Sequence, residues 1–127
     1  MCDASALISL LLDDGTDGAW VHERLRGKEL VARALVDFEV SNVIRRQEMA
    51  GHVSADVVAQ AHGDLLQLPI ERWPYELLGL RVWQLRHHLS AYDASYVAVA
   101  EIVGAPLLTL DARLARTHGL RCRVEVS

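Results

Sequence analysis

The clearest pattern in this chain lies in residues Leu89–Arg116, LSAYDASYVAVAEIVGAPLLTLDARLAR. Its first half predicts a helix, because Ser90 is a good N-cap, an apolar run follows, and Gly104 is suited to end the helix. Its second half predicts a buried apolar strand over Pro106–Thr109, after which Asp111 starts another helix. A helix, a strand and a further helix in this order indicate an α/β protein.

The rest of the chain repeats this alternation, with no linker or internal repeat. The predicted helices are Ala4–Leu12, Asp17–Leu25, Leu35–Ala50, Ser54–Leu66, Tyr75–His87, Ser90–Val103 and Ala112–His118. The predicted strands are Met1–Cys2, Glu29–Ala32, Leu68–Arg72, Pro106–Thr109 and Arg121–Val126. Strands that alternate with helices favour a parallel sheet covered on both faces, in which ligands bind at the carboxyl ends of the strands.

Length and composition fit one globular domain over residues 1–127, with 51% hydrophobic and 24% charged residues. No apolar run approaches the ~20 residues that span a bilayer, and no basic region at the start suggests a secretory signal.

Cys2 and Cys122 are interpreted as buried thiols in a reducing cytosol, which predicts a cytoplasmic protein. The net charge of −4 argues against binding nucleic acid by bulk attraction, although Lys28 is the only lysine among 13 basic residues.

Four acidic residues stand beside apolar segments, near the ends of predicted elements. They are Asp3, Glu39, Asp93 and Asp111. Without these four acids, the remaining 13 acidic residues balance the 13 basic ones, so the acidity is local. Carboxylates gathered from across a chain form a site for a hard divalent cation, because Mg²⁺ prefers oxygen ligands.

Each acid also has a structural interpretation. Asp3 and Asp111 are suited to cap helices, and Asp93 closes an S-x-x-D capping box. Glu39 lies on an apolar stripe of its helix, where a carboxylate needs a partner, and Arg46 is the local alternative. Taken one at a time these residues do not distinguish a cap from a ligand, whereas their order and their placement at strand ends are more specific.

This combination resembles the PIN-domain nucleases, in particular the VapC-type toxins of bacterial toxin–antitoxin pairs. The matching stretches are DASAL at Asp3–Leu7, FEVSNVIRR at Phe38–Arg46 and the long stretch at Leu89–Arg116. The resemblance implies a three-layer, Rossmann-like α/β/α sandwich with a mostly parallel central sheet of about five short strands. Only Met1 and Cys2 precede Asp3, where the family normally has a longer strand.

The resemblance also implies an activity, a site and partners. The activity is that of an endoribonuclease that depends on Mg²⁺, or on Mn²⁺ in its place. The implied catalytic and metal-binding residues are Asp3, Glu39, Asp93 and Asp111, and the supporting polar residues are Ser5, Asn42 and Thr109. The implied partners are an RNA substrate, a second copy in a homodimer, and a cognate VapB-type antitoxin whose peptide covers the acidic groove.

Phosphodiester hydrolysis needs an activated water and a place for negative charge, and bound divalent ions supply both. We expect Asp3 and Asp93 to bind the tighter ion, Glu39 to bind it or orient the water, and Asp111 to serve a weaker second site. Without metal, each like-charge pair at ~5 Å costs about 3 kcal/mol at an effective dielectric of 20. The metal-free site should therefore bind cations readily or hold a proton.

Other side chains near these acids leave two interpretations open. Four arginines can receive RNA phosphates or remain solvated surface charges; they are Arg45, Arg46, Arg113 and Arg116. Leu77 and Trp83 are expected to pack in the core rather than form an interaction face. The main alternative to the nuclease is a non-catalytic PIN-like domain that acts only through its partner.

Overall fold

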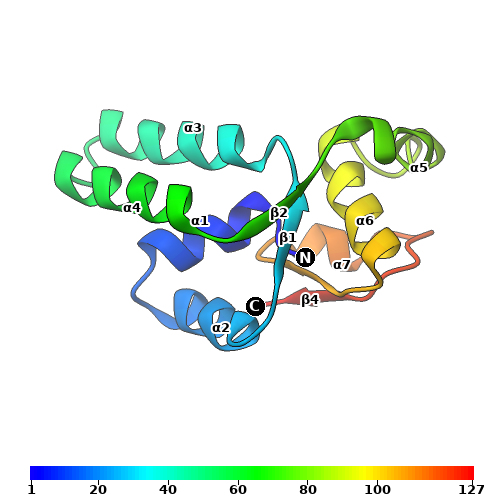
Figure 1. The fold of residues 1–127 in the computed structure, drawn as a ribbon, viewed down its shortest axis with the longest axis horizontal. Coiled ribbons are helices and arrows are strands. Elements are labelled where there is room, and N and C mark those ends of the chain that lie inside the picture. The colour runs from blue at the N-terminus through cyan, green and yellow to red at the C-terminus, as the bar shows by residue number, and fades with distance from the viewer.

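The computed structural model describes all residues 1–127 and contains short parallel strands between two layers of helices (Figure 1). Two pairs of strands are hydrogen-bonded in parallel, β1 with β2 and β3 with β4. Their bounds are β1 Leu30–Arg33, β2 Ile70–Trp73, β3 Leu107–Thr109 and β4 Val124–Val126. The predicted α/β class with parallel strands is confirmed, with four strands instead of about five.

The N-terminal residues join the two pairs of strands and stand where the fifth strand is predicted. Cys2 forms a parallel bridge with Leu108, and its N–H donates to the carbonyl of Val31 at 3.1 Å. The order across the sheet is therefore β2, β1, the N-terminal residues, β3 and β4. Burial raises the pKa of the Cys2 thiol to about 11, so the thiol stays protonated inside the sheet.

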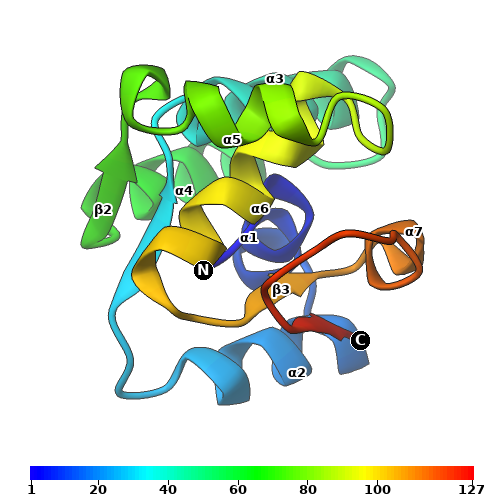
Figure 2. The same ribbon diagram turned by 90° about the vertical axis from the view of Figure 1, so that its right-hand side faces the viewer.

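Seven α-helices and one 3₁₀ helix surround the strands. Their bounds are α1 Ala4–Leu12, α2 Thr16–Leu25, α3 Val36–Met49, α4 Ala55–Gln67, η1 Tyr75–Leu77, α5 Gly79–Gln84, α6 Ala91–Val103 and α7 Ala112–Ala115. Helices α1, α3 and α4 pack together on one face of the sheet, and α6 with α5 covers the other (Figures 1 and 2). No helix combines the length and the apolar character that crossing a membrane requires.

Helix α6 is the most buried helix and follows the predicted pattern closely. Ser90 caps it by accepting the backbone N–H of Asp93 at 3.2 Å, and Gly104 ends it with a left-handed φ of 69°. Every residue from 94 to 100 is buried. Small alanines on several sides let this helix lie close to both β1 and β3, which fixes its first turn near the carboxyl ends of those strands.

The predicted continuous helix over residues 75–87 is wrong, because the structure has η1, a break before Gly79, and then the short α5. The predicted core positions of Leu77 and Trp83 are also wrong, since these side chains are 59% and 65% exposed. The face of Leu78, Val82 and Leu85 enters the core instead, at the i, i+4, i+7 spacing of a helix.

Candidate active site

Asp3 lies where the N-terminal residues leave the sheet and α1 begins, and its side chain is buried. Its Oδ1 accepts hydrogen bonds from the Ser5 hydroxyl at 2.6 Å and from the Ala6 N–H at 3.0 Å. The Thr109 hydroxyl donates to its Oδ2 at 2.5 Å. Burial raises the pKa of Asp3 and outweighs these hydrogen bonds, which lower it. Asp3 is therefore both a helix cap and a costly buried carboxylate.

Two hydroxyls connect this carboxylate to the end of β3. The Ser5 and Thr109 oxygens lie 3.3 Å apart, and Ser5 also accepts the Leu110 N–H at 3.0 Å. The Thr109 oxygen accepts the Asp111 N–H at 2.9 Å. The backbone that carries Asp111 is thus fixed relative to Asp3 by side chains that the sequence identifies as supporting residues.

Glu39, in the first turn of α3, is paired with an arginine from β1. Its Oε1 accepts the Nε–H of Arg33 at 2.9 Å, and the Tyr96 hydroxyl donates to the same oxygen. Tyr96 also accepts the Ala4 N–H at 3.2 Å, which links Glu39 to the start of α1. The alternative pairing of Glu39 with Arg46 is wrong, because Arg46 lies exposed two helical turns away.

Asp93 has the only carboxylate of the four that accepts no hydrogen bond within the protein. Its backbone N–H donates to Ser90, so one half of the predicted capping box is formed. Burial is the main cause that raises the pKa of Asp3, and the Asp93 charge adds to it; Asp93 also lines one pocket with Asp111 and Arg113. Asp93 therefore lies between Asp3 and the α7 segment with both carboxylate oxygens free.

Asp111 caps α7 and is paired with the first-turn arginine of that helix. It accepts the Arg113 backbone N–H at 2.9 Å and both Nε and NH2 of the same guanidinium. The hydrogen bonds from Arg113 lower the pKa of Asp111. Asp93 and Asp111 line one surface pocket of about 430 Å³, together with Arg113, His88 and Thr117.

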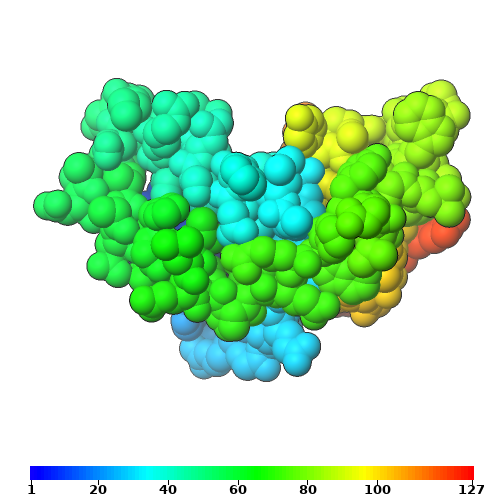
Figure 3. Space-filling view, turned by 45° about the horizontal axis from the view of Figure 1, so that its top comes forward, coloured from blue at the N-terminus to red at the C-terminus, as the bar shows by residue number.

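The other predicted residues lie on the surface. The Asn42 amide oxygen accepts hydrogen bonds from Arg45 at 3.1 and 3.3 Å, and no hydrogen bond joins Asn42 to the acids. Arg45, Arg46 and Arg116 are exposed. Figure 3 shows that the surface is hollowed between the cyan segment of α3 and the yellow segment of α6, whose first turns carry Glu39 and Asp93.

The donor set suits a hard divalent cation, because the four acids and the two hydroxyls all offer oxygen. No group of three or more His, Cys, Asp or Glu side chains lies close enough together to hold a metal ion in this arrangement. Glu39 and Asp111 are each paired with an arginine, whereas Asp3 and Asp93 have no cationic partner. These two carboxylates are the ones available to hold a cation.

Arg33 and Tyr96 are site residues that the sequence interpretation missed. Arg33 ends a short apolar strand, which makes it look like an ordinary strand-terminal charge. Tyr96 lies three residues after Asp93, so both occupy one face of α6, and this spacing was the available signal. Burial is the largest cause that raises the pKa of the Tyr96 hydroxyl, and its hydrogen bond to Glu39 adds to the shift. Tyr96 therefore remains a protonated donor.

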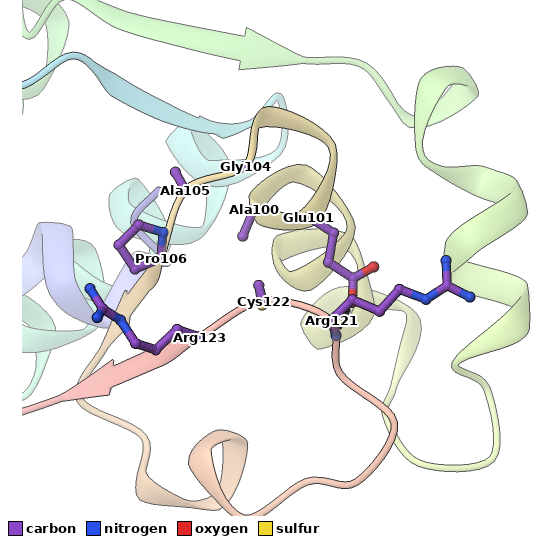
Figure 4. Close-up of a pocket in the computed structure, with 8 residues that line it drawn as sticks. All are labelled: Ala100, Glu101, Gly104, Ala105, Pro106, Arg121, Cys122 and Arg123. Carbon is purple, nitrogen blue, oxygen red and sulfur yellow. Dashed lines mark hydrogen bonds between the residues drawn. The ribbon is translucent and has the colours of Figure 1, made fainter.

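A second cavity, of about 370 Å³, lies at the amino ends of β3 and β4, at the opposite edge of the sheet (Figure 4). Its lining residues are Ala100, Glu101, Gly104, Ala105, Pro106, Arg121, Cys122 and Arg123. The side chains of Arg121 and Arg123 extend away from each other in Figure 4, so no set of charges converges on this cavity. The Glu101 carboxylate in this cavity is held by several hydrogen bonds. It accepts two from the Arg81 guanidinium, at 2.6 and 3.1 Å, and one from the Arg121 N–H at 2.7 Å.

We expect the Glu101→Gln variant to lose about 2–3 kcal/mol of unfolding free energy at pH 7, between the values of exposed and buried ion pairs. Burial alone would raise the pKa of Glu101, but hydrogen bonds from Arg81 and Arg121 hold it below its usual value. The stabilisation is therefore present above the unfolded pKa and is lost as the pH falls through the folded pKa. Urea unfolding at pH 7 and pH 4 measures it. Glu23→Gln, in an exposed pair with Arg26, is the control, and equal stability of the two variants would contradict this account.

Comparison with known proteins agrees with this geometry. A family model described as PIN domain matches residues 1–120, and the chain therefore belongs to the PIN-domain family. The resemblance found in the sequence is confirmed.

Within that family, the similar curated proteins are VapC ribonucleases. The chain is 41% identical to Ribonuclease VapC12 of Mycobacterium tuberculosis over 128 residues, covering 98% of this chain and 95% of the relative. It is 36% identical to VapC ribonuclease Mb0985 of Mycobacterium bovis and 34% identical to Ribonuclease VapC1 of M. tuberculosis. These two matches each cover 98% of this chain and 94% of the relative.

Proposed function

We propose that this chain is a VapC-type toxin, an endoribonuclease that uses Mg²⁺ at the edge of the sheet where Asp3, Glu39, Asp93 and Asp111 lie. The ribonuclease class follows from the family and from the names of its relatives. The observation that carries the site assignment is the pair of carboxylates, Asp3 and Asp93, without cationic partners. A buried carboxylate with a raised pKa beside a second free carboxylate is an arrangement that a divalent cation stabilises.

A divalent cation at Asp3 and Asp93 supplies positive charge that activates water and stabilises the phosphoryl oxygens. The chain's own residues orient the groups around it. Ser5 and Thr109 donate to the two oxygens of Asp3 and so fix the plane of its carboxylate. Tyr96 and Arg33 hold Oε1 of Glu39, which leaves Oε2 free to accept a proton from water or to orient it.

The proposed substrate is RNA, bound locally rather than by overall charge. Arg45 and Arg46 on α3 and Arg116 beyond α7 have exposed guanidinium groups, which suit bidentate contacts with phosphates. Arg113 is already paired with Asp111, so its contact with RNA would compete with that ion pair.

The proposed partners are a VapB-type antitoxin and a second copy of the chain, in the cytoplasm. Large apolar side chains exposed on η1 and α5 support a protein interface; they are Tyr75, Leu77, Leu80 and Trp83, each at least 58% exposed. Exposed apolar patches of this kind mark interaction surfaces in soluble proteins. An acidic groove also suits a basic inhibitory peptide.

Removal of divalent cations is expected to stop RNA cleavage completely, and added Mg²⁺ is expected to restore it. The measurement is cleavage of purified RNA by the metal-free chain, with EDTA, with Mg²⁺ and with Mn²⁺. Circular dichroism with EDTA is the control, and it should show an intact fold because the core is a cluster of 26 buried apolar residues. Equal cleavage with and without EDTA would contradict metal dependence, while no cleavage under any condition would favour the non-catalytic alternative.

A further inference from the structure

Arg33 is the only buried arginine of the chain, with 5% of its surface exposed, and it ends β1 at the edge where the acids lie. Its NH1 donates to the Ser95 hydroxyl at 2.7 Å, and its Nε donates to Glu39. The guanidinium carbon lies 4.4 Å from the centre of the Tyr96 ring and 5.3 Å from that of Tyr92. These contacts, from α3 and from two turns of α6, lock the cation in one position.

The contacts of Arg33 concentrate on one oxygen of Glu39. Oε1 receives the Nε–H of Arg33, forms an ion pair with the NH2 group of Arg33, and accepts the Tyr96 hydroxyl. The NH2 group is fully buried, and the Glu39 carboxylate is its ion-pair partner. Burying an ion pair costs desolvation that well-packed apolar side chains would avoid, so fold stability alone does not explain why an arginine stands here.

The net negative charge at this edge equals in magnitude the charge of one divalent cation. The four carboxylates of Asp3, Glu39, Asp93 and Asp111 face two guanidinium groups, which leaves two negative charges. Arg113 keeps its ion pair with Asp111 at the surface, whereas Arg33 is buried and is held on four sides beside Glu39. A second divalent ion at Glu39 would lie beside this fixed positive charge and be repelled by it.

We propose that Arg33 replaces a second metal ion at Glu39, so that the site binds one divalent cation through Asp3 and Asp93. This inference rests on the proposed metal-dependent function. It makes Arg33 a positioning residue, because it acts through the Glu39 carboxylate and is too buried to touch RNA.

The test is a titration of the metal-free full chain with Mn²⁺ at pH 7.5, without RNA. Calorimetry and electron paramagnetic resonance measure the number of bound ions and their affinity. The native chain is expected to bind one Mn²⁺. Arg33→Met removes the charge but keeps an unbranched apolar side chain, and we expect it to bind a second Mn²⁺ or to bind the first at least 10-fold more tightly. Arg33→Lys keeps the charge and should bind one ion. These are changes in metal stoichiometry or affinity, which a merely structural role of Arg33 would not produce.

Arg24→Met is the matched control. Arg24 also forms an ion pair, with Glu125, and lies over the ring of Trp20. It belongs to α2, which precedes the amino end of β1, whereas Arg33 lies at the carboxyl end of that strand. This variant changes the net charge equally and should still bind one Mn²⁺ with affinity within twofold of native. The double variant Arg33→Met/Glu39→Gln removes both charges and should also bind one ion.

The outcomes separate this inference from the proposed function. Two Mn²⁺ ions on the native chain, or unchanged binding by a folded Arg33→Met variant, would overturn the role of Arg33 alone. If Arg33→Met does not fold, the native stoichiometry still tests the inference, because two Mn²⁺ ions on the native chain would overturn it. Absence of Mn²⁺ binding by the native chain would instead overturn the metal site itself.

Discussion

Replacing Asp93 with Asn is expected to lower the rate of RNA cleavage by on the order of 10³-fold, the scale seen when one group that stabilises developing charge is lost. Asp93 has the only free carboxylate of the four acids, so its charge is available to a cation without breaking any contact. The fold should be unaffected, because the Asp93 side chain accepts no hydrogen bond and the Ser90 cap uses its backbone N–H. We expect a stability change within ~0.5 kcal/mol.

Cleavage rate with saturating Mg²⁺ and thermal unfolding of the same samples measure the two effects. Asp56→Asn is the matched control, because Asp56 also lies in the first turn of a serine-capped helix, α4, but is exposed and away from the acids. The control should cleave RNA at the native rate. A folded Asp93→Asn variant that retains cleavage within tenfold of native would show that this carboxylate holds no essential cation.

The sequence predicts the fold well where local signals agree with tertiary packing. The bounds of α1 match the prediction because Asp3 caps the helix, and those of α6 match because Ser90 and Gly104 delimit it. Such caps act within one turn of the chain, so they can be recognised without knowing the partners of the helix. The short strands are less well bounded, because their ends depend on pairing with neighbours.

The prediction of one continuous helix over residues 75–87, with Leu77 and Trp83 in the core, is wrong because the local pattern is ambiguous there. This segment carries apolar side chains all around the helix axis, including Leu77, Leu78, Val82 and Trp83. Two different faces can therefore be drawn as the buried one, and the pattern alone does not choose between them. Packing against α6 selects the face of Leu78 and Val82 and leaves Trp83 at the surface, with Arg86 over its ring at 4.8 Å.

The candidate site was only partly predictable for a similar reason. The acids could be proposed from their order, but their partners depend on where β1, α3 and α6 meet. Arg33 and Ser95 are 62 positions apart, and Tyr96 and Glu39 are 57 positions apart. No local pattern links residues at such distances, so the role of Arg33 becomes visible only from the packed structure.

Replacing Asp3 with Asn is expected to abolish cleavage, again by on the order of 10³-fold, while making the protein more stable at pH 7.5. Burial disfavours the charged form of Asp3 and raises its pKa, so the ionised carboxylate costs stability at neutral pH. Asn is among the best N-cap residues and keeps an oxygen for the Ala6 N–H. Its amide can donate to Thr109, whose hydroxyl can turn its proton toward Ser5.

The pH dependence of this effect follows from the direction of the pKa shift. Because the folded state binds the Asp3 proton more tightly than the unfolded state, native stability rises relative to the variant as the pH falls through the folded pKa. The stability gap should therefore be largest at pH 7.5 and should narrow toward pH 4. Thermal unfolding across this range measures the gap, and added Mg²⁺ should raise the melting temperature of the native chain but not that of the variant.

A variant less stable than native at pH 7.5 would contradict the cost assigned to the buried charge, and cleavage by the variant would contradict its role as a ligand. Increased stability together with lost activity is the combination expected of a carboxylate kept at this position for a metal ion rather than for the fold.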